Sequence, residues 1–403
     1  MHLTLLTQYF PPEIGAPQAR LSELASHFVR NGHSVTVLTA MPNYPTGKIH
    51  HGYGGILRRE GKSGTDVIRT FIYPTQKASL VPRMVNYLSF VLSSSILGSI
   101  VLRRTDYLLV ESPPLFLGLS GAWLSMLKRA RLIFNVSDLW PESAVRLGLV
   151  QRKSLSFRLS QCLERFCYRR AWLVTGQSKT ILANIQERFP DCSTFHLSNG
   201  VDTGVFSADK SNDTVRTILN GNGRMVALYA GLHGLAQGLD QVLDAAEALR
   251  AESTLQFVLV GDGPEKKTLL EHAKRRRLDN VRFLDARPAR DIPSFIAAAD
   301  IVIVPLKTYI PGAVPSKLYE AMASSRPVVL VAEGEAAEIV REHQAGLVVK
   351  PGDVSGLVQA LSSLCSQSSL RQTLGVNGRR AAELSFDRAQ IAARFIKHLE
   401  RSL

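Results

Sequence analysis

The chain has 403 residues, of which 45% are hydrophobic and 20% charged, so it is long and apolar enough for two folded domains and is not a disordered chain. Its four cysteines include no CxxC pair, which argues against a disulfide framework and a structural zinc site. The formal net charge is +14, and the excess lies in residues 1–200, which hold 23 Lys and Arg but only 11 Asp and Glu. A basic first half favours a polyanionic partner (nucleic acid, anionic lipid or a pyrophosphate ligand), with scattered solvated charges as the alternative.

The first 40 residues predict one βαβ unit. Residues 3–7 and 34–39 are apolar, strand-like runs. Between them, apolar residues recur at helical spacing, at Leu21, Leu24, Ala25, Phe28 and Val29. Such a unit implies parallel strands joined by a right-handed crossover. No basic stretch precedes the first apolar run, so we expect no signal peptide.

A turn containing Pro11, Pro12 and Gly15 joins the first strand to the first helix. Gly15 would let a phosphate or a sugar approach the backbone at the positive end of that helix, so it is a candidate residue for binding such a ligand. An ordinary tight turn explains the same glycine equally simply.

The segment 84–102 carries no charge and is flanked by Arg83 and by Arg103 and Arg104. Its length nearly suffices to span a bilayer, but Asn86 and five serines make it a poor span. Two interpretations stay open: a helix buried in the core, or a helix that lies on a membrane surface with basic flanks.

Asp138 follows a strand-like run in the first half, and Glu142 stands close behind it in the sequence NVSDLWPE (135–142). A carboxylate at the end of a strand could act as a base or orient a hydroxyl, so both residues are candidate catalytic groups. A helix cap is the alternative, because Asp138 stands four residues before Glu142, which is nearly a capping arrangement.

The second half alternates strand-like and helical stretches again. Its apolar runs lie at residues 225–229, 256–260, 281–284, 301–305 and 327–331. Together the two halves predict an α/β fold of two Rossmann-like, doubly wound parallel-sheet domains that face each other across a cleft. The turn-rich segment SNGVD sets the expected boundary, giving domains 1–198 and 199–385, with a C-terminal helix at about 386–403 that packs back on the first domain.

Three glycines, Gly231, Gly234 and Gly238, stand between a strand and a helix in the second domain. They suit close contact of the backbone with a pyrophosphate, although packing alone could require them. The pattern is not GxGxxG, and no acidic residue is obviously placed to hold the ribose of a nicotinamide cofactor. In the same turn, Gln237 is a candidate residue for binding the pyrophosphate ligand and His233 a candidate catalytic one.

The segment 312–320 (GAVPSKLYE) is the most informative part of the second domain. Pro315 and Ser316 suit a helix start, where Lys317 would add positive charge to the exposed amides. Glu320, one turn further, could accept hydrogen bonds from two ribose hydroxyls. An ordinary surface pair of Lys317 and Glu320 is the alternative. The remaining candidates for binding this ligand are Val314 and Arg287.

Taken together, these motifs resemble glycosyltransferase family 4 over essentially the whole chain. The segments that carry the resemblance are QYFPPEIG (8–15), NGHSVTVLT (31–39), NGVD (199–202) with Phe206, VGDGP (260–264) and EAMA (320–323). Three further segments are more specific and resemble the bacterial L-fucosamine (FucNAc) transferase branch: PNYPTG (42–47), SDLWPES (137–143) and PSK (315–317).

This resemblance implies the GT-B fold and a retaining transfer from a nucleoside-diphosphate sugar, with no metal or other cofactor. It implies that Glu320 holds the ribose and that the loops 231–238 and 312–317 hold the diphosphate and the sugar. The chain departs from the family pattern in three ways. Gly312 replaces the first carboxylate of an E-x7-E pair, Leu232 and Gln237 replace an Arg and a Lys, and Ser137-Asp138 replaces a histidine. We therefore expect backbone amides and Lys317 to meet the diphosphate charge, and Asp138 to orient the sugar.

The leading hypothesis is transfer of a sugar, for example an N-acetylated deoxyhexosamine such as L-FucNAc, from a UDP-sugar to a polyprenyl-diphosphate-linked glycan. The enzyme would act peripherally, at the cytoplasmic face of an anionic membrane, in surface-polysaccharide assembly. The alternative is a non-hydrolysing UDP-sugar epimerase of the same fold. Such an enzyme would need no lipid surface, so the uncharged segment 84–102 argues against it. A non-catalytic polyanion-binding protein is disfavoured, and we expect no nucleic acid partner, because aromatic residues are only 7% and no basic stripe interleaves with them.

Overall fold

The computed structural model describes residues 1–13, 15–76, 79–146, 150–220 and 223–403, and it divides the chain into two compact units. Unit 1 comprises Met1–Asn199 and Ala389–Leu403, and unit 2 comprises Gly200–Arg388. Helix α15 (Arg388–Glu400) therefore belongs almost wholly to unit 1, although it follows unit 2 in the chain.

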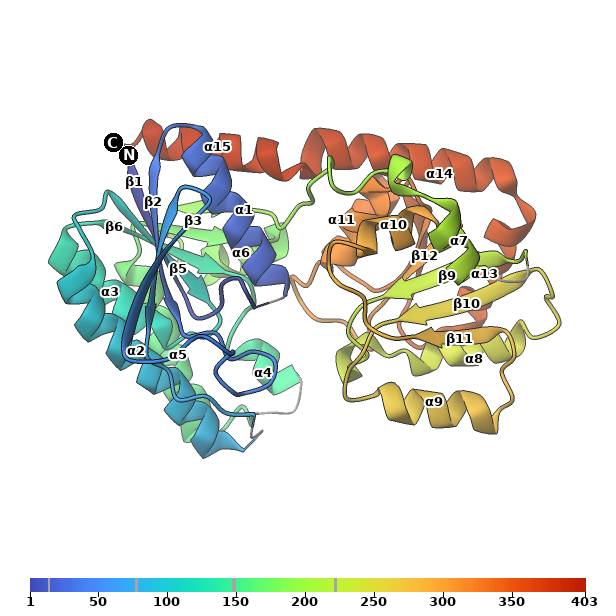
Figure 1. Cartoon of the computed structure of the whole chain (residues 1–403), viewed down its shortest axis with the longest axis horizontal. Coiled ribbons are helices and arrows are strands. Elements are labelled where there is room, and N and C mark those ends of the chain that lie inside the picture. Colours follow the sequence, from blue (N-terminus) through green and yellow to red (C-terminus); the bar gives the residue numbers. More distant parts are fainter. Residues whose placement is uncertain (14, 77–78, 147–149, 221–222) are drawn as a thin grey trace. The chain divides into compact units, whose positions relative to one another are not determined.

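Unit 1 is built on an eight-stranded sheet in the order β3-β4-β2-β1-β5-β6-β7-β8 (Figure 1). The strands are β1 (His2–Thr7), β2 (Ser34–Ala40), β3 (Leu57–Lys62), β4 (Thr65–Thr70), β5 (Tyr107–Ser112), β6 (Arg131–Val136), β7 (Leu173–Gly176) and β8 (Thr194–His196). All neighbours pair in parallel except β3, an antiparallel edge strand on β4. The predicted βαβ unit is confirmed, because β1 and β2 pair in parallel with Leu3 opposite Val35.

Helices cover both faces of this sheet, because alternate residues of each strand point to opposite sides. Leu3 and Leu5 pack with α1 and α15 on one face, whereas Leu6 packs with α2, α3 and α5 on the other. The helices before α15 are α1 (Ala16–Arg30), α2 (Leu80–Val101), α3 (Leu117–Lys128), α4 (Glu142–Arg146), α5 (Leu155–Arg170) and α6 (Lys179–Arg188).

Unit 2 has a six-stranded, wholly parallel sheet in the order β11-β10-β9-β12-β13-β14. The strands are β9 (Met225–Ala230), β10 (Leu255–Val260), β11 (Val281–Leu284), β12 (Ile301–Pro305), β13 (Val328–Val331) and β14 (Gly346–Val349). The helices are α7 (Asp213–Leu219), α8 (Asp240–Ala248), α9 (Lys266–Arg275), α10 (Ile292–Ala297), α11 (Ser316–Ala323), α12 (Glu335–Glu342), α13 (Val354–Ser366) and α14 (Ser368–Ala381). Leu228 faces the layer of α10 and α11, and Tyr229 faces the layer of α8 and α13. The predicted pair of doubly wound α/β domains is thus confirmed.

Helix α2 contains the uncharged segment 84–102 up to Val101, and it fits neither sequence interpretation fully. Phe90, Val91 and Ser94 are buried against the domain, as expected of a core helix. Leu92 and Ile96 are each 62% exposed, as expected of a surface helix. The segment is therefore apolar on both its inner and its outer face.

Candidate active site

Two glycine turns lie side by side at the carboxyl edge of the unit 2 sheet. Gly231 directly follows β9 and Gly261 directly follows β10, and the Gly231 amide donates to the Val260 carbonyl at 2.9 Å. Their φ angles are +154° and +150°, which side chains rarely allow. A Cβ on Gly261 would also collide with the Gly231 carbonyl. Gly261 is therefore required by the close packing of the two turns, and Gly231 by its backbone conformation.

Lys317 lies against the first of these turns. A Cβ on Gly231 would meet the Lys317 side chain, and the Lys317 Nζ is 5.8 Å from the ring centroid of Tyr229. Lys317 is the second residue of α11, which begins at Ser316. No carboxylate within the described ranges forms an ion pair with this ammonium. An ammonium without an ion pair, beside a glycine turn and a helix start, suits a phosphate group.

The rest of the 231–238 turn contains a second polar group without a partner. Gly234 precedes the 3-10 turn Leu235–Gln237, and a Cβ on Gly234 would meet the Gln237 side-chain oxygen. That oxygen is buried and accepts no hydrogen bond from any residue that the structure describes. Gln237 thus has an acceptor available close to the glycine turn.

The remaining donor-binding candidates occupy three different environments. Glu320 is half-buried one turn after Lys317 on α11, and its carboxylate forms no hydrogen bond or ion pair with the described residues. The half-buried Ser316 hydroxyl also forms no hydrogen bond with them. The Val314 side chain is buried in the core, so only its backbone could contact a ligand. Arg287 is exposed after β11, with its guanidinium carbon 5.6 Å from the Phe295 ring centroid.

His233, the catalytic candidate of unit 2, is fully buried beneath the glycine turns. Its ring lies between Tyr229 and Phe283, with centroids 5.9 Å and 6.2 Å away. Neither ring nitrogen makes a hydrogen bond of normal geometry in the described part of the chain. Burial, together with the positive charge of Lys266, lowers the pKa of His233 to about 4 against smaller opposite effects. The ring is therefore neutral at pH 7, and it is not accessible from the solvent in this structure.

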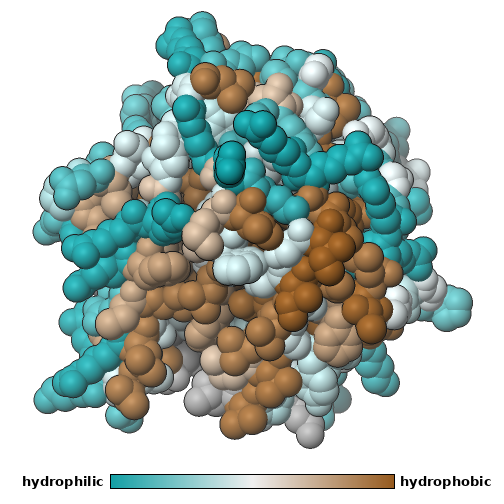
Figure 2. Space-filling view, turned by 90° about the vertical axis from the view of Figure 1, so that its left-hand side faces the viewer, coloured by the Kyte–Doolittle hydropathy of each residue, from teal (hydrophilic) through white to brown (hydrophobic). Residues whose placement is uncertain are grey.

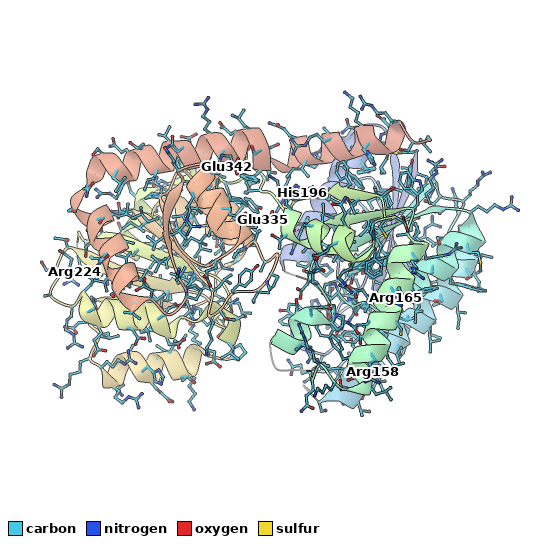
Figure 3. All side chains as sticks on the ribbon, turned by 180° about the vertical axis from the view of Figure 1, so that it is seen from behind. Arg158, Arg165, His196, Arg224, Glu335 and Glu342 are labelled. Carbon is cyan, nitrogen blue, oxygen red and sulfur yellow. The ribbon has the colours of Figure 1, made fainter. Side chains whose placement is uncertain are left out.

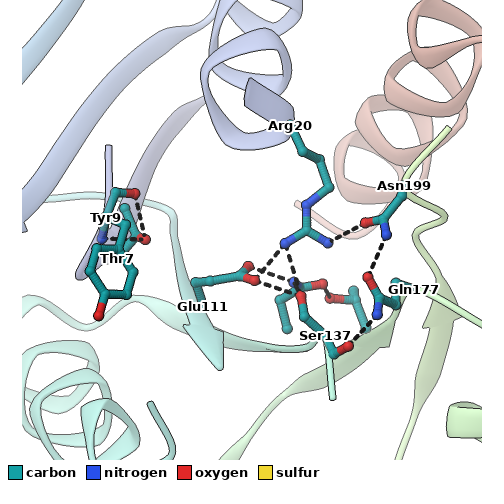
Figure 4. A network of polar contacts seen from close by, with 9 residues as sticks. Thr7, Tyr9, Arg20, Glu111, Ser137, Gln177 and Asn199 are labelled. Carbon is teal, nitrogen blue, oxygen red and sulfur yellow. Dashed lines mark hydrogen bonds and ion pairs between the residues drawn. The ribbon is translucent and has the colours of Figure 1, made fainter. Parts of the chain in front are cut away.

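A network of polar side chains around the buried Arg20–Glu111 pair lies at the carboxyl edge of the unit 1 sheet (Figure 4). The Arg20 guanidinium donates to the Glu111 carboxylate at 2.5 Å, to the Ser137 hydroxyl at 2.9 Å and to the Asn199 side chain at 2.9 Å. The Ser137 hydroxyl and the Asn135 amide each donate to Glu111 at 2.6 Å. Arg20 and Glu111 are 7% and 3% exposed, so this is a buried, multiply hydrogen-bonded ion pair.

Sequence reasoning missed this network, although one signal was present. Glu111 is a carboxylate at the end of the apolar strand β5, and such a group needs a cationic partner when it is buried. The position of Arg20 within α1 could not be matched to Glu111 from spacing, since the two residues are 91 positions apart.

Asp138 lies just beyond this network, in the loop that follows β6. Its carboxylate accepts a hydrogen bond from the Ser143 hydroxyl, and its half-buried position raises its pKa against the opposing effects of Ser143 and the Leu139 amide. A raised pKa makes a carboxylate a better proton acceptor. The same loop is ordered by the Ser143 contact, so a structural role of Asp138 also fits the geometry.

Glu142 and Asp138 interact with different residues. It is the first residue of α4, and its carboxylate is 3.8 Å from the Arg188 guanidinium. Arg188 in turn pairs with the buried Glu164. Glu142 therefore belongs to a carboxylate–arginine cluster, whereas Asp138 is bonded to Ser143.

Gly15 has a weaker requirement for glycine than the unit 2 turns. Its φ is 171°, which any residue can adopt, and a Cβ would meet only the flexible Gln18 side chain. Ile14 of the same turn lies outside the described residues. The turn is fixed instead by Glu13, whose carboxylate accepts the amides of Asn43 and Tyr44 at 2.9 and 2.8 Å.

Each unit thus presents polar groups at the carboxyl edge of its parallel sheet, where ligands of doubly wound folds bind. The unit 2 edge offers a cation, turn amides and a free carboxylate, and the unit 1 edge offers a carboxylate held by a rigid frame. Across the residues described, no three His, Cys, Asp or Glu side chains gather in a way that could hold a metal ion.

Comparison with known proteins assigns both units. Residues 15–196 match the family model "Glycosyl transferase 4-like domain", and residues 212–381 match "Glycosyl transferases group 1". Over 402 residues and 97% of each chain, the protein is 25% identical to the "Putative colanic acid biosynthesis glycosyl transferase WcaI" of Escherichia coli K12.

Two solved structures share the fold over nearly the whole chain. Sucrose-phosphate synthase from Thermosynechococcus elongatus has a TM-score of 0.79 at 18% identity and covers 99% of this chain and 98% of its own. HepE from Anabaena, in complex with UDP-glucose, has a TM-score of 0.71 at 19% identity and full coverage of both chains. The chain is therefore a glycosyltransferase of the GT-B fold, in which a glycosyl transferase 4-like domain precedes a group 1 domain.

Proposed function

We propose that this chain transfers a sugar from a UDP-sugar to a polyprenyl-diphosphate-linked glycan, in the assembly of a bacterial O-antigen, capsule or exopolysaccharide. The role in polysaccharide assembly is supported by the name of the relative WcaI, a colanic acid biosynthesis glycosyl transferase. The transfer proceeds with retention, and the donor sugar is an N-acetylated deoxyhexosamine such as L-FucNAc. Retention depends on the resemblance to glycosyltransferase family 4, and the donor sugar depends on the resemblance of the segments 42–47, 137–143 and 315–317.

The observation that carries the proposal is the unpaired Lys317 beside the Gly231 turn. A diphosphate needs donors and positive charge on several oxygens, and turn amides with one ammonium supply both. The complex of HepE with UDP-glucose supports a nucleotide-sugar donor for a fold of this kind. In this chain the Leu232 and Gln237 side chains bring no charge to the turn, so Lys317 is the cation on which donor binding depends.

We assign the ribose contacts and the reacting hydroxyl to two other residues. Glu320, one turn further along α11 and without a partner among the described residues, accepts the ribose hydroxyls. Asp138 orients or deprotonates a reacting hydroxyl, and its raised pKa fits that role. Since these groups meet the donor's charge without a metal ion, we propose that transfer persists in the presence of a chelator.

A donor panel tests the proposal. The purified full chain is incubated with UDP-, GDP- and dTDP-sugars and a lipid-linked acceptor, and both nucleotide release and sugar transfer to the organic phase are measured, with and without EDTA. We expect a UDP-sugar to give equal amounts of UDP and lipid-linked product in both conditions. Interconversion of UDP-sugars without an acceptor and without transfer would overturn the proposal in favour of an epimerase.

A charge-matched pair of variants ties the reaction to the site. Lys317→Ala should lower kcat/KM for the donor by roughly 10- to 100-fold, because a charge-assisted hydrogen bond contributes about 1.5–3 kcal/mol. Lys274→Ala removes the same charge from the exposed face of α9 and should leave the reaction unchanged. Equal activity of the two variants would remove Lys317 from the donor site.

A further inference from the structure

Helix α2 presents a continuous apolar stripe to the outside of unit 1. Its exposed large apolar residues are Val81, Val85, Leu88, Leu92, Ile96 and Ile100, which are 39–75% exposed. They follow one another at intervals of three and four residues, so they lie along one side of the helix. A stripe of six such residues is unusual for a surface that meets only water.

The two neighbouring helices extend this stripe into a face. Helix α3 exposes Leu119, Trp123, Met126 and Leu127. Helix α5 exposes Leu155, Leu159 and Phe166. α2, α3 and α5 lie together on one side of the sheet (Figure 1). Figure 2 looks at this side of the molecule and shows hydrophobic surface gathered over its lower half, with hydrophilic side chains above and beside it. We call these exposed apolar side chains of α2, α3 and α5 the three-helix apolar face.

The charges of these helices are almost all positive. The exposed charged residues within them are Arg83 on α2 and Arg158, Arg165, Arg169 and Arg170 on α5. Figure 3 shows Arg158 and Arg165 on α5. The three helices contain one carboxylate, Glu164, which is buried and paired with Arg188. No exposed carboxylate of these helices therefore neutralises the arginines.

The contacts of α2 with the rest of unit 1 argue that this helix does not cross a membrane. By length and composition, Val81–Val101 is the one helix within the described residues that could do so, and 28% of its apolar window is buried. However, Asn86 accepts a hydrogen bond from Gln8 at 3.0 Å, and the Ser94 hydroxyl bonds that of Ser120 on α3 at 2.9 Å. A Cβ on Gly98 would press on Leu38 of β2. One side of α2 is thus part of the domain, and only the other side is available.

We propose that the three-helix apolar face docks unit 1 on an anionic phospholipid bilayer and lies in the interface without crossing it. The apolar side chains enter the headgroup region, and the arginines at its margin meet lipid phosphates. A second copy of this chain is a poorer occupant, because it would bring arginines against arginines. An anionic bilayer satisfies both the apolar surface and its positive charge.

The position of α2 connects this face to the acceptor side of unit 1. The Asn86 side chain bonds Gln8, which directly follows β1, and donates to the Tyr73 carbonyl in the loop that follows β4. The first turns of α2, with Arg83, therefore lie at the carboxyl edge of the sheet. If the proposed function is correct, docking would place this edge at the depth of the acceptor's diphosphate. That connection rests on the proposed function, whereas the docking itself does not.

Flotation with vesicles tests the docking. The full chain is mixed with phosphatidylcholine vesicles, or with vesicles of phosphatidylcholine and phosphatidylglycerol, at low and high salt. We expect binding to the anionic vesicles that weakens at high salt but persists in part, because salt screens the charges and leaves apolar insertion intact. A folded wild-type protein that stays with the soluble fraction at low salt would overturn the proposal.

Two pairs of variants assign the binding to this face. Leu92→Ser with Ile96→Ser should lower vesicle partitioning roughly 10- to 100-fold. Val376→Ser with Leu384→Ser is the control in unit 2, since those residues are 65% and 62% exposed, close to the 62% of Leu92 and of Ile96. Arg158→Gln with Arg165→Gln should lower it about 30-fold at low salt, at about fivefold per arginine. Lys274→Gln with Arg275→Gln is the matched control.

Circular dichroism and thermal melts of each variant show whether it remains folded, and Val91 is left unchanged because it is buried. Equal binding by the Leu92/Ile96 variant and its control would overturn the proposal. So would a wild-type dimer that ignores vesicles and becomes monomeric in that variant, since a second copy would then cover the face. A chain that docks but transfers no sugar from any donor would contradict the proposed function and leave the docking intact.

Discussion

At the carboxyl edge of the unit 1 sheet, Arg20, Glu111 and Ser137 bond one another. At the same edge of unit 2, the side chains of Lys317 and Glu320 form no hydrogen bond or ion pair with the described residues. The first arrangement fixes geometry, because every buried charge is already paired. The second leaves charge and acceptors for a ligand to satisfy. The two edges should therefore fail differently on mutation: unit 1 in stability or turnover, and unit 2 in ligand affinity.

Asp138 offers the largest expected effect, because it borders the rigid edge without belonging to its ion pair. If its carboxylate orients or deprotonates a hydroxyl, Asp138→Asn should lower turnover by about 10²–10⁴-fold with UDP affinity unchanged. Ser143→Ala is the matched control, since it removes the hydrogen bond to Asp138 and keeps the carboxylate. Turnover and melting temperature are measured on the same preparations. Two variants that each lose about 1 kcal/mol of stability and keep full activity would make Asp138 structural.

Replacing Arg20 tests whether its ion pair with Glu111 stabilises the carboxyl edge of the unit 1 sheet. Arg20→Ala leaves Glu111 buried and unpaired, and breaking such a pair typically costs 3–5 kcal/mol of unfolding free energy. Arg59→Ala is the control: Arg59 bonds Asp66 at 2.7 Å through two nitrogens but is 58% exposed, so solvent screens this pair and its loss should cost far less. Urea titrations of both variants measure the difference. Equal losses would mean that the unit 1 edge is not stabilised by its ion pair.

The contrast between the edges also explains what the sequence could predict. Gly231 and Lys317 could be found because each is a local signal, a glycine after a strand and a lysine at a helix start. The parallel pairing of β1 and β2 followed from their apolar runs and the helical pattern between them. Arg20 and Glu111 could not be paired, because tertiary contact joins them across 91 positions. The strand β14 was missed because four residues, GLVV, carry too little periodicity.

Replacing Glu320 tests whether the carboxyl edge of the unit 2 sheet binds the nucleotide. Glu320→Ala should weaken UDP binding by roughly ten- to hundredfold, because a hydrogen bond to a charged group contributes about 1.5–3 kcal/mol. Since Glu320 has no partner in the part of the chain that the structure describes, the unfolding free energy should change by less than about 1 kcal/mol. Glu342→Ala, on the exposed side of α12, is the control. Calorimetry that finds the same UDP affinity in both folded variants would remove Glu320 from the ribose site.

The smallest expected effect is the loss of stability caused by protonation of His233. This loss tests whether the ring of His233 is uncharged in the folded unit 2 turn. Its pKa is lowered from an ordinary 6.5 to about 4 in the folded state, so the unfolded chain binds a proton first as the pH falls. The stability from this group is complete above pH 6.5 and is lost as the pH falls toward 4. Between pH 7 and pH 5 the loss should be about 2 kcal/mol.

His233→Phe keeps a ring between Tyr229 and Phe283 and cannot be protonated, so it isolates this loss from that of other titrating groups. The wild-type chain should lose about 2 kcal/mol more than the variant between pH 7 and pH 5, as measured by urea unfolding. Parallel pH curves for the two proteins would mean that the ring is protonated, or exposed, in the folded turn. Full transferase activity of the variant at pH 7 would assign His233 to the support of the turn, whereas a folded but inactive variant would place the ring in the reaction.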